Sequence, residues 1–252
     1  MDINNIKEIK QSMEAYGLDI VEPLSLSWYN TELQVSGNAE ISPRGTAGEN
    51  ALLILVGNSK HLWDNFVQEY QSLSPEGKAK DKNPLNTYVE KSVKASLASS
   101  PFAEEACQII WSHEKIELKG SKSGYVAFQR MASVCGLAFL DTEQSHLSIH
   151  PIFGSWYSLR CAIVFHDIAC TLVKPEKIPD PFSMDDKARV QDAARRAEAS
   201  LSAASSAHGV NFSSSWQVWV ELREAVSPRN KHRFSENQIL YHYTHEARYI
   251  EP

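Results

Sequence analysis

The chain has 252 residues, of which 42% are hydrophobic and 22% charged, a composition typical of a globular protein with a sizeable core. Its formal net charge of −6 argues against a protein that follows the phosphates of a nucleic acid. The four cysteines form no CxxC pair, residues 1–12 do not resemble a signal peptide, and the longest apolar run, Ala51–Val56, is far below the roughly 20 residues that span a bilayer. We therefore expect a cytoplasmic protein with reduced thiols and no membrane segment.

The first half of the chain predicts helices that surround a buried strand. Apolar residues recur at helical spacing through Ile3–Tyr16, a short strand is expected at Leu18–Leu26, and Trp28–Asn30 opens a polar segment. The run Ala51–Val56 predicts a fully buried central strand. The elements expected next are a helix over Lys60–Leu73 capped by Ser59, a charged loop over Ser74–Asn83, a helix over Pro84–Leu97, a strand over Ala106–His113 and a buried central helix over Tyr125–Leu140.

The segment after the central helix predicts a β-hairpin. Its two apolar runs, His146–Ile149 and Trp156–Phe165, are separated by a proline and a glycine, as in a tight connection between paired strands.

Alternation along the second run places an arginine inside a buried strand. The two faces that it predicts are Trp156, Ser158 and Arg160 on one side and Tyr157, Leu159 and Cys161 on the other. A buried guanidinium requires an anion, which is either a carboxylate of this chain or a bound ligand.

The last third of the chain predicts a linker followed by helices. Pro175–Phe182 is punctuated by prolines, Ser183–Ala207 has the composition of an exposed helix, and His208–Ser215 interrupts it before two short helices at Trp216–Val226 and Ser235–Tyr243. The mixed order of strands and helices favours an α+β fold, a mainly antiparallel sheet with packed helices. We expect one globular unit, with a core over residues 1–174 and a linker and C-terminal helical cap over residues 175–252 that complete the site.

The common nucleotide and hydrolase motifs are absent, and no metal site is evident. The sequence has no G-x-G-x-x-G, no P-loop and no G-x-S-x-G, which does not exclude flavin. His146 and His150 would lie roughly 13 Å apart on a strand, too far to share one metal. His242 and His245 lack a third ligand, and we interpret them as a surface pair. We therefore expect no metal bound by protein side chains, and we assign no catalytic residue.

A second group of residues lies on the predicted helix near the C-terminus. Trp216, Trp219, Val220 and Arg223 share one face at helical spacing. The spacing alone favours a helix packed by its tryptophans, with Arg223 paired to Glu224 or to a neighbour.

Three segments together resemble the cobalamin-processing CblC family, also called MMACHC. They are YGLDIVEPLSLSWYN (Tyr16–Asn30), IHPIFGSWYSLR (Ile149–Arg160), and WQVWVELREAVSP with RFSENQ (Trp216–Pro228 and Arg233–Gln238). The resemblance implies a fold like the flavin-dependent nitroreductases and a cavity that takes cobalamin with its lower base detached. It also implies removal of the upper cobalt ligand, by glutathione-dependent dealkylation or by decyanation with a thiol or with reduced FMN or FAD.

The resemblance further implies partners and an assembly. The partners are an adaptor of the CblD type and methionine synthase. The assembly is a monomer or a ligand-promoted homodimer. Two alternatives stay open: a cobalamin carrier without turnover, and a nitroreductase-like flavoprotein with other substrates. Only the first function, ligand removal with glutathione, requires a set of arginines.

The resemblance also assigns site residues. Glutathione is expected at Arg160, Arg223 and Arg248, with Trp219 as the accompanying aromatic residue. The corrin contacts that it implies are Ser112, Val126, Ala127, Phe128, Gln129, Leu140, Asp141, Thr142, Ser148 and Leu159.

Two residues depart from the family pattern. Ser148 stands where the family has a cysteine, which removes any thiol next to the corrin and makes an external reductant necessary. Ser133 stands where the family has a histidine, which weakens inference about the lower face of the corrin.

Overall fold

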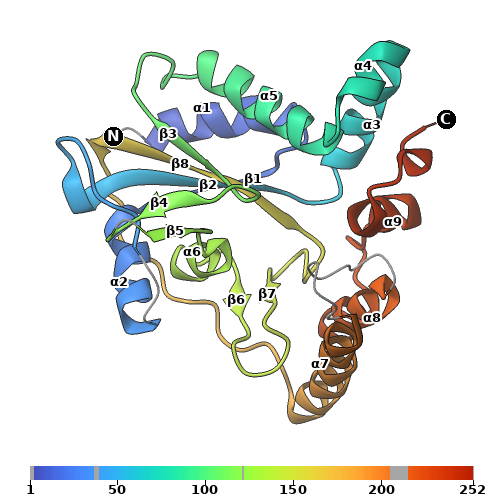
Figure 1. The fold of residues 1–252 in the computed structure, drawn as a ribbon. Helices are drawn as coiled ribbons and strands as arrows, with labels where there is room; N and C mark the ends of the chain where they lie inside the picture. The colour runs from blue at the N-terminus through green and yellow to red at the C-terminus, as the bar shows by residue number, and fades with distance from the viewer. Residues whose placement is uncertain (1–2, 37–39, 121, 205–214, 252) are drawn as a thin grey trace.

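A four-stranded antiparallel sheet lies at the centre of the fold (Figure 1). The computed structural model describes residues 3–36, 40–120, 122–204 and 215–251. The strands, in their order across the sheet, are β1 (Ile20–Ser25), β2 (Ala51–Asn58), β8 (Ser158–Ala169) and β3 (Gln108–Trp111). Every residue of β2 is buried, so the predicted central strand is confirmed. The expected antiparallel sheet with packed helices is confirmed as well, whereas the likeness to nitroreductases stays a prediction.

Helices cover both faces of the sheet because the inner strands are apolar on both sides. The helices on one face are α1 (Ile3–Glu14), α3 (Leu62–Ser72) and α5 (Pro84–Ala98). The helices on the other face are α2 (Leu26–Ser36) and α6 (Phe128–Val134). Alternation along β2 divides its side chains between the two cores, with Ile54 on the α1 side and Leu53 and Leu55 on the α6 side.

The smaller elements lie around this sheet. They are the helix α4 (Pro75–Lys80), the paired strands β4 (Ile116–Leu118) and β5 (Lys122–Gly124), the paired strands β6 (Phe139–Leu140) and β7 (Ser148–Ile149), and the short turns η1 (Gly48–Asn50) and η3 (Ala247–Tyr249).

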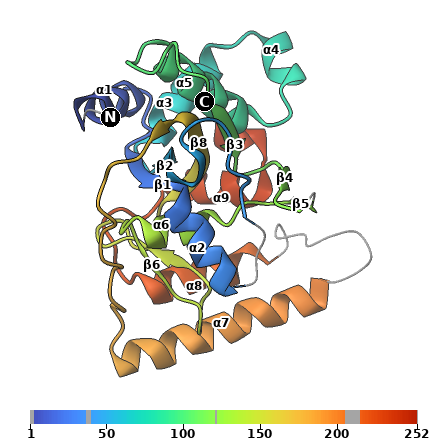
Figure 2. The ribbon, with the colours of Figure 1, turned by 90° about the vertical axis from the view of Figure 1, so that its left-hand side faces the viewer.

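The C-terminal helices lie at one end of the sheet. They are α7 (Met184–Ala204), α8 (Trp216–Val226) and α9 (Glu236–Thr244). Figure 2 shows α7 as a long helix along the outside of the molecule, and its buried Val190 and Ala197 share a small apolar core with Leu222 of α8. Tyr241 of α9 instead joins the main core, with its ring 5.6 Å from that of Trp63.

These three helices were expected from the sequence, within a few residues. Residues 205–207 of the predicted α7 and residues 208–214 of the predicted break lie outside the described residues. The division into a core and a cap stays a prediction. None of the described helices combines the length and the apolar composition needed to cross a membrane.

The predicted hairpin between His146–Ile149 and Trp156–Phe165 is wrong. β7 pairs with β6, whereas β8 pairs with β2 and β3 in the main sheet. The chain between them is reversed by a tight turn, in which His150 and Gly154 exchange two backbone hydrogen bonds of 2.8 Å and Gly154 has a φ of 59°. β8 can enter the middle of the sheet because residues on both of its faces are apolar.

Two predicted helices differ in extent from the observed ones. Residues from Trp28 onward form α2 and not a polar segment, because Tyr29 and Leu33 supply a buried face among polar neighbours. The central helix α6 is much shorter than predicted. Its chain turns at Gly136, with a φ of 71°, and residues 139–140 already form a strand.

The loop and cap predictions near α3 also need correction. Residues 75–80 of the expected loop form the helix α4, whose N-cap Ser74 accepts a hydrogen bond from the Gly77 backbone N–H (3.2 Å). Ser59 does not cap α3. Its backbone N–H and its hydroxyl donate to the carboxylate of Asp19 (2.7 and 2.5 Å), which fixes the turn before the helix.

Candidate functional site

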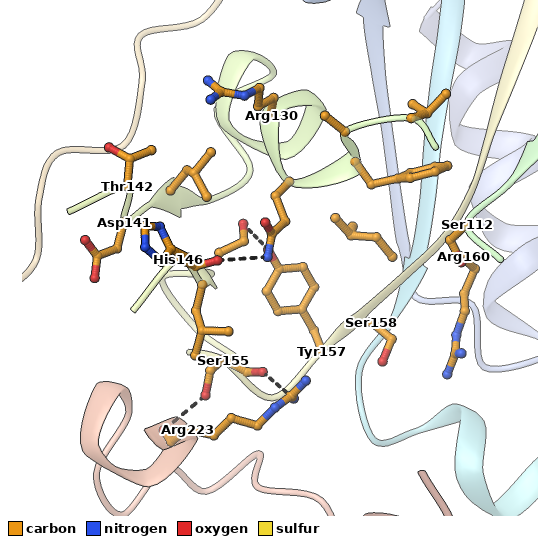
Figure 3. A pocket seen from close by; sticks show the side chains of 18 residues that line it. Ser112, Arg130, Asp141, Thr142, His146, Ser155, Tyr157, Ser158, Arg160 and Arg223 are labelled. Carbon is orange, nitrogen blue, oxygen red and sulfur yellow. Dashed lines mark hydrogen bonds between the residues drawn. The ribbon is translucent and has the colours of Figure 1, made fainter. Parts of the chain in front are cut away.

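A cavity of about 590 Å³ opens beside the start of β8. Its walls come from the first turn of α6, the connection between β6 and β7, the chain around Tyr157, and Arg223 of α8 (Figure 3). Segments far apart in the sequence therefore meet at one place, between the sheet and the C-terminal helices.

All ten residues that the resemblance assigned to the corrin line this one cavity. They are Ser112, Val126, Ala127, Phe128, Gln129, Leu140, Asp141, Thr142, Ser148 and Leu159. Arg160 and Arg223 line it as well. The structure thus brings together two groups of residues that the sequence analysis had assigned to two different ligands.

Six further lining residues were not predicted. They are Arg130, His146, Leu147, Ser155, Tyr157 and Ser158. Tyr157 could have been found, because alternation already placed it on the same face as Leu159. His146 could not, because its left-handed backbone (φ 55°) is not evident from the sequence.

The hydroxyl of Ser148 is already engaged by the protein. The buried Tyr157 hydroxyl donates a hydrogen bond to Ser148 Oγ at 2.6 Å. Burial raises the pKa of Tyr157 well above its ordinary value, so the phenol stays protonated and can donate. Ser148 therefore fixes a wall of the cavity.

The Asp141 carboxylate is used in the same way. Its oxygens accept hydrogen bonds from the backbone N–H of Glu143, Gln144 and Ser145 (3.1, 3.1 and 2.8 Å) and from the Ser145 hydroxyl (2.7 Å). Burial alone would raise the pKa of Asp141, but these bonds together hold it below its ordinary value. Asp141 thus shapes the turn after β6 and is a poor candidate for a direct charged contact with a ligand.

Arg160 sits on a β-bulge at the start of β8. Val56 of β2 pairs with Cys161, and the next residue, Gly57, pairs with Leu159, so Arg160 has no partner on β2. The bulge reorients the strand, so Cys161 packs on the opposite side of the sheet from Leu159. The prediction that Tyr157, Leu159 and Cys161 share one face is therefore wrong for Cys161.

The Arg160 guanidinium is buried without an acidic partner among the described residues. Its Nε donates to Asn58 Oδ1 at 2.6 Å, while one of its terminal nitrogens is buried with no hydrogen-bond partner in that part of the chain. Burial lowers the pKa of Arg160 to about 10, so the group remains charged at neutral pH. The sequence had left open that Arg160 pairs with a carboxylate of this chain. The structure shows the neutral amide of Asn58 in that place.

Arg223 is likewise bound to a neutral group. Its Nη1 donates to the Ser155 carbonyl oxygen at 2.8 Å, and the guanidinium lies over the Trp156 ring at 5.6 Å. Glu224, the partner expected from the sequence, pairs instead with Arg233. In the view of Figure 3 the two guanidiniums of Arg160 and Arg223 lie on either side of Ser158.

The other two residues expected at glutathione lie elsewhere. Trp219 packs in the apolar core between α7 and α8. Arg248 is exposed in η3, where it pairs with Glu246 (2.8 Å) and lies 4.8 Å from the Tyr249 ring centre. The described lining of the large cavity includes neither residue.

A second cavity of about 240 Å³ adjoins the first. It is lined by Trp156, Ser158, Arg223, Phe234, Ile239, His242 and Tyr243. Ser158 and Arg223 belong to both cavities. The predicted surface pair of His242 and His245 is therefore wrong for His242, whose Nε2 is buried, whereas His245 is exposed.

No cysteine lines either cavity in the described part of the chain. Cys107 is exposed, and Cys161 is fully buried in the main core. Burial raises the pKa of Cys135 to about 12, so this thiol is protonated at neutral pH. Ser133 is buried in α6 and is not among the lining residues of the large cavity.

Among the described residues, one group of side chains has the spacing to bind a metal ion. Glu90, His113 and Glu114 offer ligand atoms within 4.8 Å of one another. Glu90 already pairs with Lys94 (3.3 Å) and with His113 (3.5 Å), so ordinary surface ion pairs account for this cluster.

Fold and site together define an α+β protein with a large cavity at the end of its central sheet. No family model matches the chain. Among solved structures it is similar to the Caenorhabditis elegans B12-trafficking protein CblC, a human MMACHC homologue, with a TM-score of 0.68 over 96% of this chain and 92% of that chain, at 14% identity.

Two curated relatives carry one name, cyanocobalamin reductase / alkylcobalamin dealkylase. The protein from Mus musculus is 25% identical over 260 residues, which cover 96% of this chain and 80% of the relative. The protein from Danio rerio is 24% identical over 176 residues, 65% of each chain. The resemblance to the CblC family that the sequence motifs indicated is confirmed by these similarities.

Proposed function

We propose that this protein binds cobalamin in the large cavity and removes its upper axial ligand. The observation that carries the proposal is the meeting of the ten expected corrin residues with two arginines that have no acidic partner in the described chain. The names of the curated relatives and the likeness to CblC support the same function.

The cavity suits a large ring with amide groups at its edge. Its volume, about 590 Å³, lies within the roughly 300–1,000 Å³ typical of small-molecule sites. Its walls combine apolar side chains such as Val126 and Leu159 with a few polar groups, of which Gln129 and Thr142 can bond to amides. In this proposal the corrin fills the space between α6 and β8 with its lower base displaced.

The two arginines suit glutathione, which carries two carboxylates. Guanidinium groups bind carboxylates in a bidentate manner, and Arg160 and Arg223 come from two different elements on either side of Ser158. With glutathione held there, its thiolate attacks the carbon bound to cobalt. The new S–C bond forms, the Co–C bond breaks with both electrons left on cobalt, and the products are a thioether and cob(I)alamin. The thiol must come from outside, because no described cysteine lines the site.

Flavin does not fit this chain as a resident group. The helix at the cavity, α6, has only seven residues, and no glycine-rich loop leads into it, so the described cavity wall offers no recognisable phosphate-binding loop. We therefore assign reduced FMN or FAD the role of a soluble reductant for decyanation.

Two other functions explain fewer observations. A carrier without turnover, which passes cobalamin to an adaptor of the CblD type or to methionine synthase, needs the cavity but no arginine pair. A nitroreductase-like flavoprotein needs a flavin site. Either a monomer or a ligand-promoted homodimer is compatible with our proposal.

The proposal is tested by the visible spectrum of bound cobalamin. Methylcobalamin added to the protein should lose its base-on absorption band. Retention of that band, or failure to bind, contradicts the proposal. His146 is the one histidine among the described lining residues. A His146→Ala variant with the same spectrum as the wild type will show that this imidazole does not replace the base.

A further inference from the structure

The second cavity contains a histidine that packing alone does not explain. The His242 ring lies 5.5 Å from the Phe234 ring and 6.2 Å from the Trp63 ring, an environment in which a phenylalanine would pack equally well. Its Nε2 is buried and has no hydrogen-bond partner among the described residues. Since buried polar atoms are nearly always bonded, an unbonded nitrogen on a residue that lines a cavity is a candidate contact for a ligand.

The charges around His242 indicate which kind of ligand would suit this cavity. Arg223 lines the same cavity, and Arg160 is close enough to affect the His242 imidazole. Neither guanidinium has an ion pair within the described residues. Burial, and then these two cations, lower the pKa of His242 well below its ordinary value. The imidazole is therefore neutral at pH 7, and a neutral ring with one N–H can donate to an anion without repelling the arginines.

The size and position of the cavity limit the ligand further. At about 240 Å³ it is smaller than typical sites for whole ligands, so it suits one end of an elongated molecule. Ser158 and Arg223 border both cavities, so a molecule seated here can reach into the corrin cavity. A peptide with a terminal carboxylate and a central thiol has this shape.

We propose that the second cavity holds one carboxylate of glutathione and that His242 is a further binding residue, whose Nε2–H donates a hydrogen bond to that carboxylate beside Arg223. This inference rests on the proposed function. It adds a third donor to the two arginines and assigns the tripeptide a position beside the corrin.

The test compares two replacements of His242 that differ in one property. His242→Gln keeps a donor near the position of Nε2, whereas His242→Phe keeps the aromatic shape and removes the donor. His245→Asn is the matched control, because His245 is an exposed histidine of the same helix end in the left-handed conformation (φ 57°), which asparagine tolerates. Calorimetric binding of glutathione and of S-methylglutathione is measured for each protein, together with cobalamin binding as a check of folding.

We expect His242→Phe to bind glutathione and S-methylglutathione about tenfold more weakly, and His242→Gln and His245→Asn to bind both compounds nearly as well as the wild type does. Equal losses for the two compounds identify a contact at the carboxylate, since S-methylglutathione has no thiol proton. A loss confined to glutathione would show that His242 acts on the thiol, and wild-type binding by His242→Phe would show no contact. Both results overturn the inference and leave the proposed function intact.

A measurement on the wild-type protein tests the inference even if a His242 variant does not fold. In protein with ¹⁵N-labelled histidine, glutathione should shift the Nε2–H resonance of His242 downfield, whereas an unchanged resonance in the bound protein overturns the inference. If the wild type binds no glutathione at all, the thiol part of the proposed function fails together with the inference.

Discussion

Arg160 and Arg223 are the two side chains whose surroundings are least explained by the fold alone. Each guanidinium bonds to one neutral oxygen, of Asn58 or of Ser155, and neither has a carboxylate partner in the described chain. A buried cation without a counter-charge, such as Arg160, is costly to keep, and the half-buried Arg223 lines the same cavity. An anionic ligand between the two is the simplest explanation.

Replacing either arginine should selectively weaken the use of glutathione. Arg160→Ala or Arg223→Ala removes a charge-assisted contact of roughly 1.5–3 kcal/mol, about ten- to a hundredfold in thiol-dependent dealkylation. Lysine should restore only part of the activity, because a point charge cannot form the planar fork. Arg196→Ala is the control, since this exposed arginine of α7 pairs with Asp192 outside both cavities.

Cobalamin binding measured on the same variants separates the two assignments. We expect it to stay near the wild-type value. Equal losses of dealkylation and of cobalamin binding would mean that the arginines hold the corrin or the fold, and the assignment to glutathione would be wrong.

The residues that the resemblance assigned to the corrin lie together in the structure, and their contact with a corrin stays a prediction. Of the ten corrin residues only Leu159 lies in one of the three matched segments, yet all ten line one cavity. The bulge at Arg160 and the left-handed His146 were not predictable, because both depend on how β8 and the chain before it are held by distant residues. Arg248 and Trp219 were carried by the same resemblance, yet they lie away from that cavity.

The tight turn at residues 150–154 is the element that directs β8 into the sheet. His150 Nδ1 accepts hydrogen bonds from the backbone N–H of Ile152 (3.0 Å) and Phe153 (3.2 Å). A Cβ on Gly154 would lie only 2.2 Å from Ser227 Oγ, so the turn also packs directly against the chain after α8. The turn therefore connects the strand that carries Arg160 with the helix that carries Arg223.

This turn should weaken in acid. Burial lowers the pKa of His150 from 6.5 to about 4, and protonation of Nδ1 would break both turn hydrogen bonds. Above pH 6.5 the histidine is neutral in both the folded and the unfolded chain. Between pH 6.5 and about 4 only the unfolded chain takes up the proton, so the free energy of unfolding falls as the pH falls through this window.

His150→Asn should make that fall smaller, because its side-chain oxygen can accept the same two bonds and does not titrate. Urea unfolding of both proteins at pH 7 and at pH 5 measures the difference. Part of the fall will remain, since the pKa values of His166, His232 and His242 are lowered as well. An equal fall in both proteins would contradict the role given to His150.

The elements themselves were predictable where the apolar pattern was strong. The buried β2 and the helices α5, α8 and α9 match their predicted ranges within a few residues. The hairpin and the long central helix were predicted wrongly. A short apolar run does not show which strand it pairs with, or whether it forms a strand or a helix, until the rest of the sheet is known. α2 was missed since its buried face is interrupted by polar residues such as Asn30, which bonds to the Ile41 backbone.

At the scale of the whole molecule, the candidate site lies where the sheet meets the C-terminal helices (Figures 1 and 2). The sheet and α6 provide the large cavity, and α8 and α9 provide Arg223 and His242 of the adjoining one. The site is therefore complete only when residues from the middle of the chain and from its C-terminal helices are assembled. This explains why the sequence indicated its members only through a resemblance over several separated segments.

The same architecture predicts that flavin is not retained. Since no phosphate-binding loop leads into the described cavity wall, FMN or FAD should exchange freely and act as a soluble reductant. Extensive dialysis of the purified protein should remove the yellow flavin absorbance and leave cobalamin binding unchanged. A stoichiometric flavin that survives dialysis would contradict this and favour the nitroreductase-like alternative.

The central claim is that this cavity carries out removal of the upper ligand with an external thiol. Its most direct test is an anaerobic incubation of the purified protein with methylcobalamin and glutathione, followed by the visible spectrum and by assay of S-methylglutathione. We predict conversion to the cob(I)alamin spectrum with one thioether formed for each methyl group lost. A stable spectrum of bound methylcobalamin, with no thioether, would contradict the claim and identify the protein as a carrier.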